Sequence, residues 1–279
     1  MSQTVDPIRT PGGSLPLTTS DPFRRTATLA AAGGIARRSL RNIRRLPSAF
    51  LPALLMPVFQ AVAFSGTYFG ITELPGFPTD RSINWFLPLA VVMGSSFSGL
   101  GVGFATIRDL QGGFYDRLRM SPAPRRSLVL GPLLSAWGRT VIVVTIVLGV
   151  GTIFGARLTD GPLGLVTLYV AGLGMSTIGT GWGLGLAYRF RDMRAAAIMQ
   201  LTLFVGLFLT SAQSPLSLMT GWLHTVARLN PMTNILRLAR VGFLGDIVWA
   251  DCWGGLIASV AIGGLVMVFA RRGLATLDN

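Results

Sequence analysis

Few residues of this 279-residue chain could do acid–base, nucleophilic or metal chemistry, and those few are scattered. The single histidine, His224, and the single cysteine, Cys252, lack the partners that a metal cluster needs. A hydrolytic group would have to pair His224 with Ser214 or Ser217, in a stretch without an orienting motif. We therefore expect neither catalysis nor a bound cofactor in this chain.

The basic residues also limit the energy source, because all 24 of them are arginines. A phosphate loop needs a lysine that reaches the terminal phosphates of a nucleotide, so this chain cannot supply one. If ATP and Mg²⁺ drive the protein, they must bind a separate polypeptide. Ion-coupled carriers usually hold Asp, Glu or His inside the membrane, whereas all 11 acidic residues here fall in tails or loops between apolar runs. This pattern disfavours a proton or sodium antiporter.

Arg139 is the one charged residue inside an otherwise uncharged apolar run, from Leu130 to Ala156. A charge at the centre of a span costs about 2.5 to 3.5 kcal/mol, and less near an end, where arginine can snorkel. Two interpretations stay open. Arg139 anchors the span at the interface, or it contacts an anionic substrate or a partner subunit.

The elements that must position these residues are long apolar runs. Apolar residues make up 51% of the chain, only 13% of residues are charged and the mean hydropathy is +0.58, whereas soluble domains carry about 25% charged residues. Crossing about 30 Å of hydrocarbon takes roughly 20 apolar residues. Runs of about that length cover residues 46–72, 82–107, 130–156, 161–188, 195–223 and 252–270.

These runs predict an all-α integral membrane protein with six transmembrane helices. We expect a single membrane domain at residues 29–272, a disordered cytoplasmic tail rich in Pro, Gly, Ser and Thr at 1–28, and a short cytoplasmic tail at 273–279. Alternate sides of the six spans carry 18 and 5 arginines, with Arg139 left over. Because positively charged loops stay in the cytoplasm, both termini are predicted to be cytoplasmic, in the cell membrane.

The charges also indicate which partners to expect. The chain has a net charge of +13, but its arginines sit in short segments beside apolar runs and not on one face of a soluble domain. This placement favours membrane lipids over nucleic acid as partners. Just before the first run, apolar residues share one helical face: Leu29, Ala32, Ile35, Leu40, Ile43 and Leu46. The opposite face holds Arg37, Arg38, Arg41, Arg44 and Arg45, so we predict an amphipathic interfacial helix.

Two segments between runs have recognisable patterns. In the loop after the second run, Gly112 and Gly113 break a helix, and Phe114 to Met120 can form two short turns whose apolar edge contains Phe114, Leu118 and Tyr115. An exposed apolar edge of this kind is typical of a docking surface. Before the last run, Asn230-Pro231 interrupts a helical pattern that continues to Arg240, which predicts short re-entrant or interfacial helices on the outer side.

These two segments resemble type-2 ABC transporter permeases. The loop segment is similar to the cytoplasmic coupling segment of that family, and the matching residues are Gly113, Phe114, Tyr115, Asp116, Arg117, Leu118, Arg119, Met120, Ser121 and Pro122. The later segment is similar to the family's segment before the last span, through Trp222, Asn230, Pro231 and Arg240. The chain most resembles permeases of the daunorubicin-resistance type. It departs from the family in the lead to the coupling segment, which here is Asp109-Leu110-Gln111.

The resemblance implies the membrane subunit of an ATP-driven exporter of amphiphilic drugs, lipids or glycolipids. Two permease chains, either copies or relatives, would assemble with two ABC ATPase chains, and the turn from Phe114 to Met120 would sit in a groove of the ATPase. The alternatives are an ATP-independent carrier or channel and a lipid-modifying membrane enzyme.

Overall fold

The computed structural model describes residues 21–45, 47–115, 124–159, 161–245 and 248–277, and the regular structure in these ranges is helical. Four of the helices are long: α3 (Ser82–Gln111), α5 (Ser127–Ile153), α6 (Gly161–Phe190) and α10 (Trp249–Ala275). The shorter elements are α1 (Asp21–Arg45), α2 (Pro47–Thr67), η1 (Phe69–Glu73), α7 (Arg194–Phe208), η2 (Leu216–Leu218), α8 (Trp222–Leu229) and α9 (Pro231–Leu244).

The four helices α3, α5, α6 and α10 are long and apolar enough to cross a membrane. Two other apolar helical stretches, Leu54–Thr67 within α2 and all of α7, are shorter. The run at 195–223 was expected to be helical throughout, but α7 ends at Phe208. The polar stretch 210–214 and Pro215 follow, and the Thr210 hydroxyl donates to the Leu207 carbonyl, which closes the helix locally.

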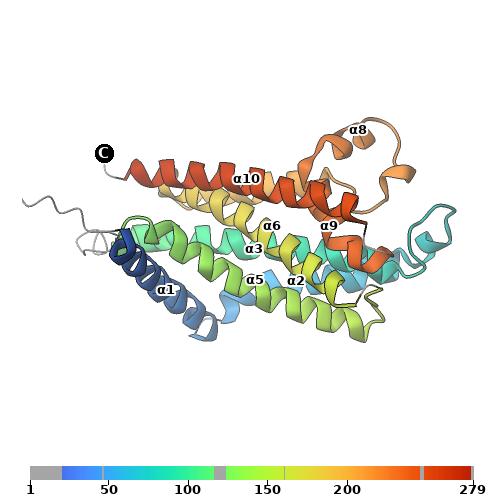
Figure 1. Ribbon diagram of the computed structural model, residues 1–279, viewed down its shortest axis with the longest axis horizontal. Helices are drawn as coiled ribbons and strands as arrows, with labels where there is room; N and C mark the ends of the chain where they lie inside the picture. Colours follow the sequence, from blue (N-terminus) through green and yellow to red (C-terminus); the bar gives the residue numbers. More distant parts are fainter. Residues whose placement is uncertain (1–20, 46, 116–123, 160, 246–247, 278–279) are drawn as a thin grey trace, which may run out of the picture.

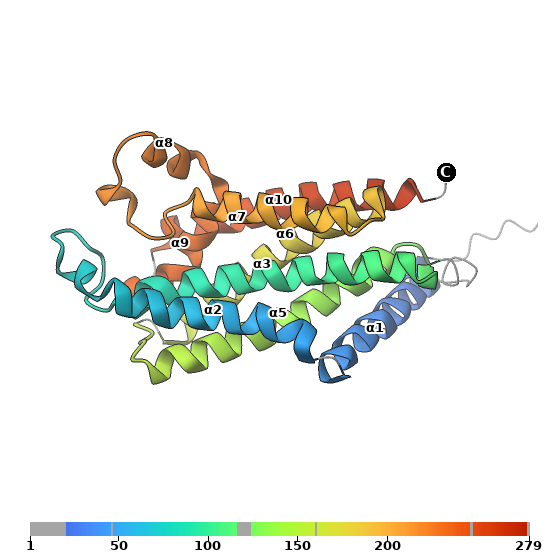
Figure 2. The ribbon, with the colours of Figure 1, turned by 180° about the vertical axis from the view of Figure 1, so that it is seen from behind.

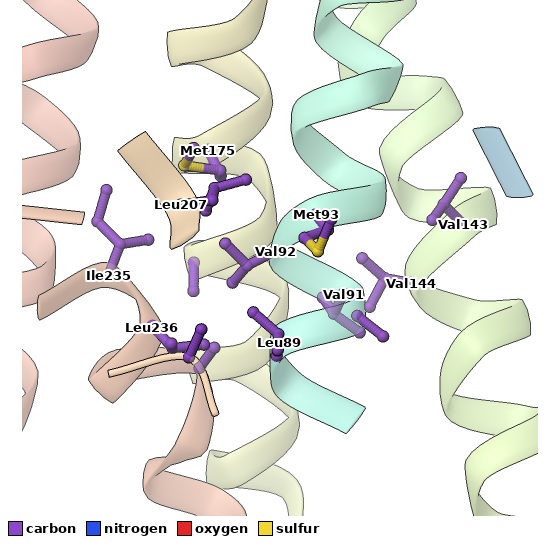
Figure 3. Packing of buried hydrophobic residues seen from close by; sticks show 14 of the residues in the cluster. Leu89, Val91, Val92, Met93, Val143, Val144, Met175, Leu207, Ile235 and Leu236 are labelled. Carbon is purple, nitrogen blue, oxygen red and sulfur yellow. The ribbon is translucent and has the colours of Figure 1, made fainter. Parts of the chain in front are cut away.

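Helix α3 lies at the centre of the bundle, between α2, α5 and α6 (Figures 1 and 2). Its most apolar stretch of 18 residues is 89% buried, against 33% for α5 and 28% for α10. A helix that is apolar on all sides is stable where other helices or lipid surround it, and α3 is surrounded mainly by other helices. In Figure 3, Val92 and Met93 of α3 pack among side chains such as Val144 of α5, Met175 of α6 and Ile235 of α9.

Glycines let the central helices approach each other closely. A Cβ atom on Gly103 of α3 would lie 2.8 Å from the Cα of Gly183 on α6. At the junction of α6 with α9, a Cβ on Gly164 would lie 2.6 Å from the Cα of Gly242. Small residues at such crossings allow close packing in lipid, where no hydrophobic driving force pushes helices together.

Helix α1 has the predicted two faces, but α5 covers much of its apolar face. Ala32 is fully buried, and a Cβ on Gly131 of α5 would lie 2.7 Å from the Cβ of Ile35. Arg37 and Arg41 are exposed on the other side. Leu29 differs from the expectation, since 62% of it is exposed. The side chains of Arg44 and Arg45, and the whole of Leu46, lie outside what the structure describes, and contact of α1 with lipid stays a prediction.

Several helix ends meet at one end of the bundle. The last residues of α3, α6 and α10 lie beside the first residues of α5 and α7, at the end that holds α1 (Figures 1 and 2). The Arg191 guanidinium donates to the Thr276 carbonyl at 2.8 Å, and the Gln111 amide to the Arg191 carbonyl at 3.4 Å. We call this the arginine-rich end, because arginines flank each of these helix ends. Elements η1 and α8 lie at the opposite end (Figure 1).

Candidate functional site

The structure describes the start of the predicted coupling segment, Gly113 to Tyr115, and places it at the arginine-rich end. The remaining residues of that segment lie outside the described residues: Asp116, Arg117, Leu118, Arg119, Met120, Ser121 and Pro122. Their role in docking an ATPase therefore stays a prediction. The described residues show how the segment is attached to the bundle.

Gly112 and Gly113 end α3 and turn the chain into the coupling segment. The Gly112 N–H donates to the Arg108 carbonyl at 2.9 Å and the Gly113 N–H to the Leu110 carbonyl at 3.2 Å. Gly113 has φ +66°, a left-handed conformation that a side chain strongly disfavours. A glycine is thus needed at this point of the motif for a local, conformational reason.

Phe114 is held between α1 and the end of α3. The Arg38 guanidinium lies 3.9 Å from the centre of the Phe114 ring. The same guanidinium donates to both carboxylate oxygens of Asp109, at 3.2 and 3.3 Å. Both charged side chains are partly exposed, so the ion pair adds only about 0 to 1 kcal/mol of stability. Its effect is positional, because it fixes α1 beside the first aromatic residue of the coupling segment.

Tyr115 corrects one expectation from the sequence. The pattern predicted that it lies on an exposed apolar edge, but only 5% of it is exposed. Its hydroxyl lies 3.0 Å from that of Tyr188 on α6, and the Tyr188 hydroxyl donates to the Leu128 carbonyl on α5 at 2.8 Å. Because the single proton of Tyr188 is used on Leu128, Tyr115 must be the donor in the tyrosine pair. Burial raises the pKa of Tyr115 to about 12, so the phenol keeps the proton that this bond requires.

The start of the coupling segment is therefore attached to four helices. Gly113 continues from α3, Phe114 touches α1 through Arg38, and Tyr115 reaches α6 and α5. A force applied to this segment would act on all four helices, since none of these contacts passes through a flexible loop. Sequence patterns did not identify Tyr188 as the partner of Tyr115, or Asp109 as the partner of Arg38. In both pairs the two residues lie far apart along the chain, and no local motif joins them.

Arg139 makes a contact that neither interpretation of the sequence included. Its Nη2 donates to the hydroxyl of Ser39 on α1 at 3.0 Å and, at 3.5 Å, to the Ser39 carbonyl. Ser135, one turn earlier on α5, donates to the same Ser39 hydroxyl at 2.7 Å. Arg139 therefore joins α5 to α1 within the chain. It also lines a cavity of about 220 Å³ between α1, α3 and α5.

At the opposite end, Asn230 joins the break after α7 to the start of α9. Its side-chain oxygen accepts the Met232 N–H at 2.9 Å, and Pro231 occupies the first turn, where a missing N–H does no harm. Its amide group donates to the carbonyls of Gly206 and Leu209 at 2.7 and 2.9 Å. These carbonyls lack partners within α7 because the helix ends there. Asn230 therefore caps the start of α9, and its hydrogen bonds also connect α9 to the end of α7.

Arg240, predicted to lie in a short re-entrant or interfacial segment, is buried, with 2% of the residue exposed. Its guanidinium donates to the carbonyls of Trp85 on α3, Ser211 and Ala212, at 3.2, 2.7 and 2.7 Å. It also lies 3.5 Å from the centre of the Trp85 ring. These contacts satisfy carbonyls left open at the start of the stretch after α7 and hold α9 against α3. Trp222, by contrast, begins α8 with 71% of its surface exposed.

The family of the chain follows from a match that covers most of its length. Residues 33–244 match the model of the ABC-2 type transporter family. The chain belongs to this family. It is a permease subunit of an ABC transporter and a multi-pass membrane protein, as the resemblance of the coupling segment implied.

Individual relatives agree with the family match. The chain is 25% identical over 253 residues to the daunorubicin resistance ABC transporter permease protein DrrB1 of Streptomyces coeruleorubidus, and the match covers 89% of this chain and 86% of that protein. It is also 25% identical over 209 residues to the putative transport permease ycf38 of Pyropia yezoensis, covering 73% and 70% of the two chains. The ycf38 permease of Porphyra purpurea is 24% identical over 211 residues, covering 74% and 71%.

Proposed function

We propose that this chain is the membrane subunit of an ATP-driven exporter that moves an amphiphilic drug, lipid or glycolipid outward across the cell membrane. A separate ABC ATPase would bind ATP and Mg²⁺ and supply the energy. The observation that carries the proposal is the attachment of the coupling segment, whose first residues contact α1, α5 and α6 as well as α3. A segment attached in this way can transmit ATPase closure to the helices of the bundle.

The orientation belongs to the same proposal. The arginine-rich end faces the cytoplasm, where the ATPase docks, and α2 and α7 complete a set of six spans with α3, α5, α6 and α10. Helix α1 lies along the cytoplasmic interface, and α8 and α9 lie at the outer side. The single membrane domain covers residues 29–272. This arrangement is supported by the arginine distribution and by the meeting of five helix ends beside α1.

The cargo class is proposed by analogy, because one similar permease is named for daunorubicin resistance. Two permease chains would form the transport path between them. An ATP-independent carrier is the weaker candidate. Asp109, the acidic residue nearest the end of α3, pairs with Arg38 at the arginine-rich end, whereas ion-coupled carriers usually hold such a group inside the membrane.

Co-purification tests the docking step. The chain would be co-expressed with the ABC ATPase of a neighbouring gene, and Phe114 and Leu118 would each be replaced by Asp. A charge on the docking surface should weaken the association about tenfold or more. Phe69→Asp is the matched control, since Phe69 is 72% exposed at the opposite end of the bundle. ATPase association that survives both substitutions unchanged would sink the docking assignment.

A further inference from the structure

A cavity at the arginine-rich end has walls that suit an anionic amphiphile. It has a volume of about 220 Å³ and lies between α1, α3 and α5, beside the start of the coupling segment. Arg38, Arg108 and Arg139 contribute cationic groups to its wall. Apolar side chains such as Ile35, Ile43 and Phe104 form much of the rest. The coupling proposal assigns no ligand to this space.

The charges around the cavity do not balance. Among the described residues that line it, Asp109 is the one carboxylate, and it already receives two hydrogen bonds from Arg38. Arg108 and Arg139 are thus left as two cations on the wall of one cavity, and like charges repel each other. A bound anion would relieve this repulsion.

Arg139, which lines this cavity, also has unused hydrogen-bonding capacity. One of its terminal nitrogens donates to Ser39, but Nε is buried without a hydrogen-bond partner in the described part of the chain. Gly101 lies opposite, and a Cβ there would sit 3.6 Å from Nη1 of Arg139. Gly101 and Arg139 therefore line the same part of the cavity, close to each other. Arginine is well suited to phosphate because its planar fork can donate two parallel bonds.

We propose that this cavity binds the phosphate group of an anionic phospholipid from the leaflet at the arginine-rich end, with Arg139 and Arg108 as the phosphate ligands. Basic pockets between membrane helices commonly bind such head groups. The apolar wall then contacts the start of an acyl chain, which free phosphate lacks. The site concerns lipid binding to the permease itself and does not depend on the ATPase or on the cargo.

The test is lipid binding to the purified full-length chain in detergent, measured by native mass spectrometry and by thermal shift. Phosphatidylglycerol should bind about tenfold or more tightly than phosphatidylcholine. Arg108→Gln and Arg139→Gln should each weaken phosphatidylglycerol binding about tenfold, since each removes a charge-assisted contact. Arg108 is exposed, so its substitution leaves the packing intact even if the Arg139 variant fails to fold.

Two further variants separate a specific site from general attraction to the basic surface. Arg189→Gln removes an exposed arginine at the same end that does not line the cavity, and it should leave binding unchanged. Gly101→Leu fills the space without altering charge and should abolish binding. Equal binding of the two lipids, or equal loss in the Arg108 and Arg189 variants, would overturn the proposal. Competition by inorganic phosphate at the same concentration as the lipid would overturn the assignment to a lipid.

Discussion

Hydrogen bonds to distant partners give some single residues of the bundle a structural role. Tyr188 both donates and accepts, because it donates to the Leu128 carbonyl and receives the proton of Tyr115. Arg240 satisfies three carbonyls with one guanidinium. The role of such a residue depends on which groups of the fold it hydrogen-bonds and not on its residue type alone. Substitutions that remove one partner at a time should therefore have unequal costs.

The two tyrosines should differ in their effect on stability. Tyr188→Phe leaves the buried Leu128 carbonyl without this donor and removes the oxygen that accepts from Tyr115, and should cost about 1 to 3 kcal/mol. Tyr115→Phe removes a donor only, since the Tyr188 oxygen can remain an acceptor without one, and should cost about 0.5 to 1.5 kcal/mol. Thermal unfolding of both variants in one detergent measures the difference. The opposite order would contradict the donor assignment.

Arg240→Met should destabilise the junction of α9 with α3 by about 2 to 4 kcal/mol, because buried carbonyls lose their donors. The loss of stability in Arg240→Lys should fall between that of the wild type and that of Arg240→Met. An ammonium group cannot reach all three acceptors and stack on Trp85 at once. Arg237→Met is the control on the same helix, because Arg237 is half exposed and only loosely paired with Asp251, at 3.9 Å. Unfolding temperatures that drop equally for the Arg240 and Arg237 variants would show that burial of Arg240 is unimportant.

At the scale of elements, backbone approach decides how the helices pack. The α3 and α6 backbones meet where Gly103 faces Gly183, and the neighbouring Gly99 faces the Ser176 carbonyl. Hydropathy recognises both helices but cannot say which of the many glycines forms a contact. Gly149 of α5, for example, has open space where its Cβ would be.

The contrast between Gly103, which contacts α6, and Gly149, which faces open space, gives a matched pair of substitutions. Gly103→Ala places a methyl group 2.8 Å from a backbone atom of α6, so the helices must separate, at a cost of about 1 to 3 kcal/mol. Gly149→Ala should be neutral or stabilise the protein by up to about 1 kcal/mol, because alanine is the better helix former. Size-exclusion profiles recorded after a heating series would measure the thermal stability of both variants. A Gly103 variant as stable as the wild type would mean that the α3–α6 crossing is looser than described.

For the whole molecule, the arrangement of charge implies a direction. Arginines from distant parts of the sequence lie at one end of the bundle, where α1 and the coupling segment also lie. The other end has the exposed aromatic residues Trp222 and Phe69. Such asymmetry is typical of a membrane protein whose basic end remains in the cytoplasm.

Cysteine labelling tests that direction. In a background with Cys252 replaced by Ser, a cysteine at Asp80 should react with an impermeant maleimide in intact cells, because Asp80 is exposed at the end opposite α1. A cysteine at Ala275, exposed at the end of α10, should react only after the membrane is opened. The reverse pattern would invert the proposed orientation and remove the coupling segment from the side where ATP is available.

Much of the fold was readable from local sequence. The starts of α3 at Ser82 and of α6 at Gly161 are those expected from the apolar runs, and Gly113 ends a helix where the pattern placed a break. The end of α7 was missed by about 15 residues because the segment after it carries no charge, although its polar residues and Pro215 end the helix. Its carbonyls are satisfied by Asn230 and Arg240, which hydropathy does not count.

The amino-acid sequence by itself determined that this chain is a helical membrane protein and which end is basic, because these properties follow from the composition of contiguous segments. It also carried the family motif. Only the tertiary structure decided that Tyr115 is an anchor, that Arg139 faces α1 across a cavity and that Arg240 is buried. Each of these depends on partners brought from distant positions along the chain, and no local periodicity records which carbonyl, ring or hydroxyl will lie beside a given side chain.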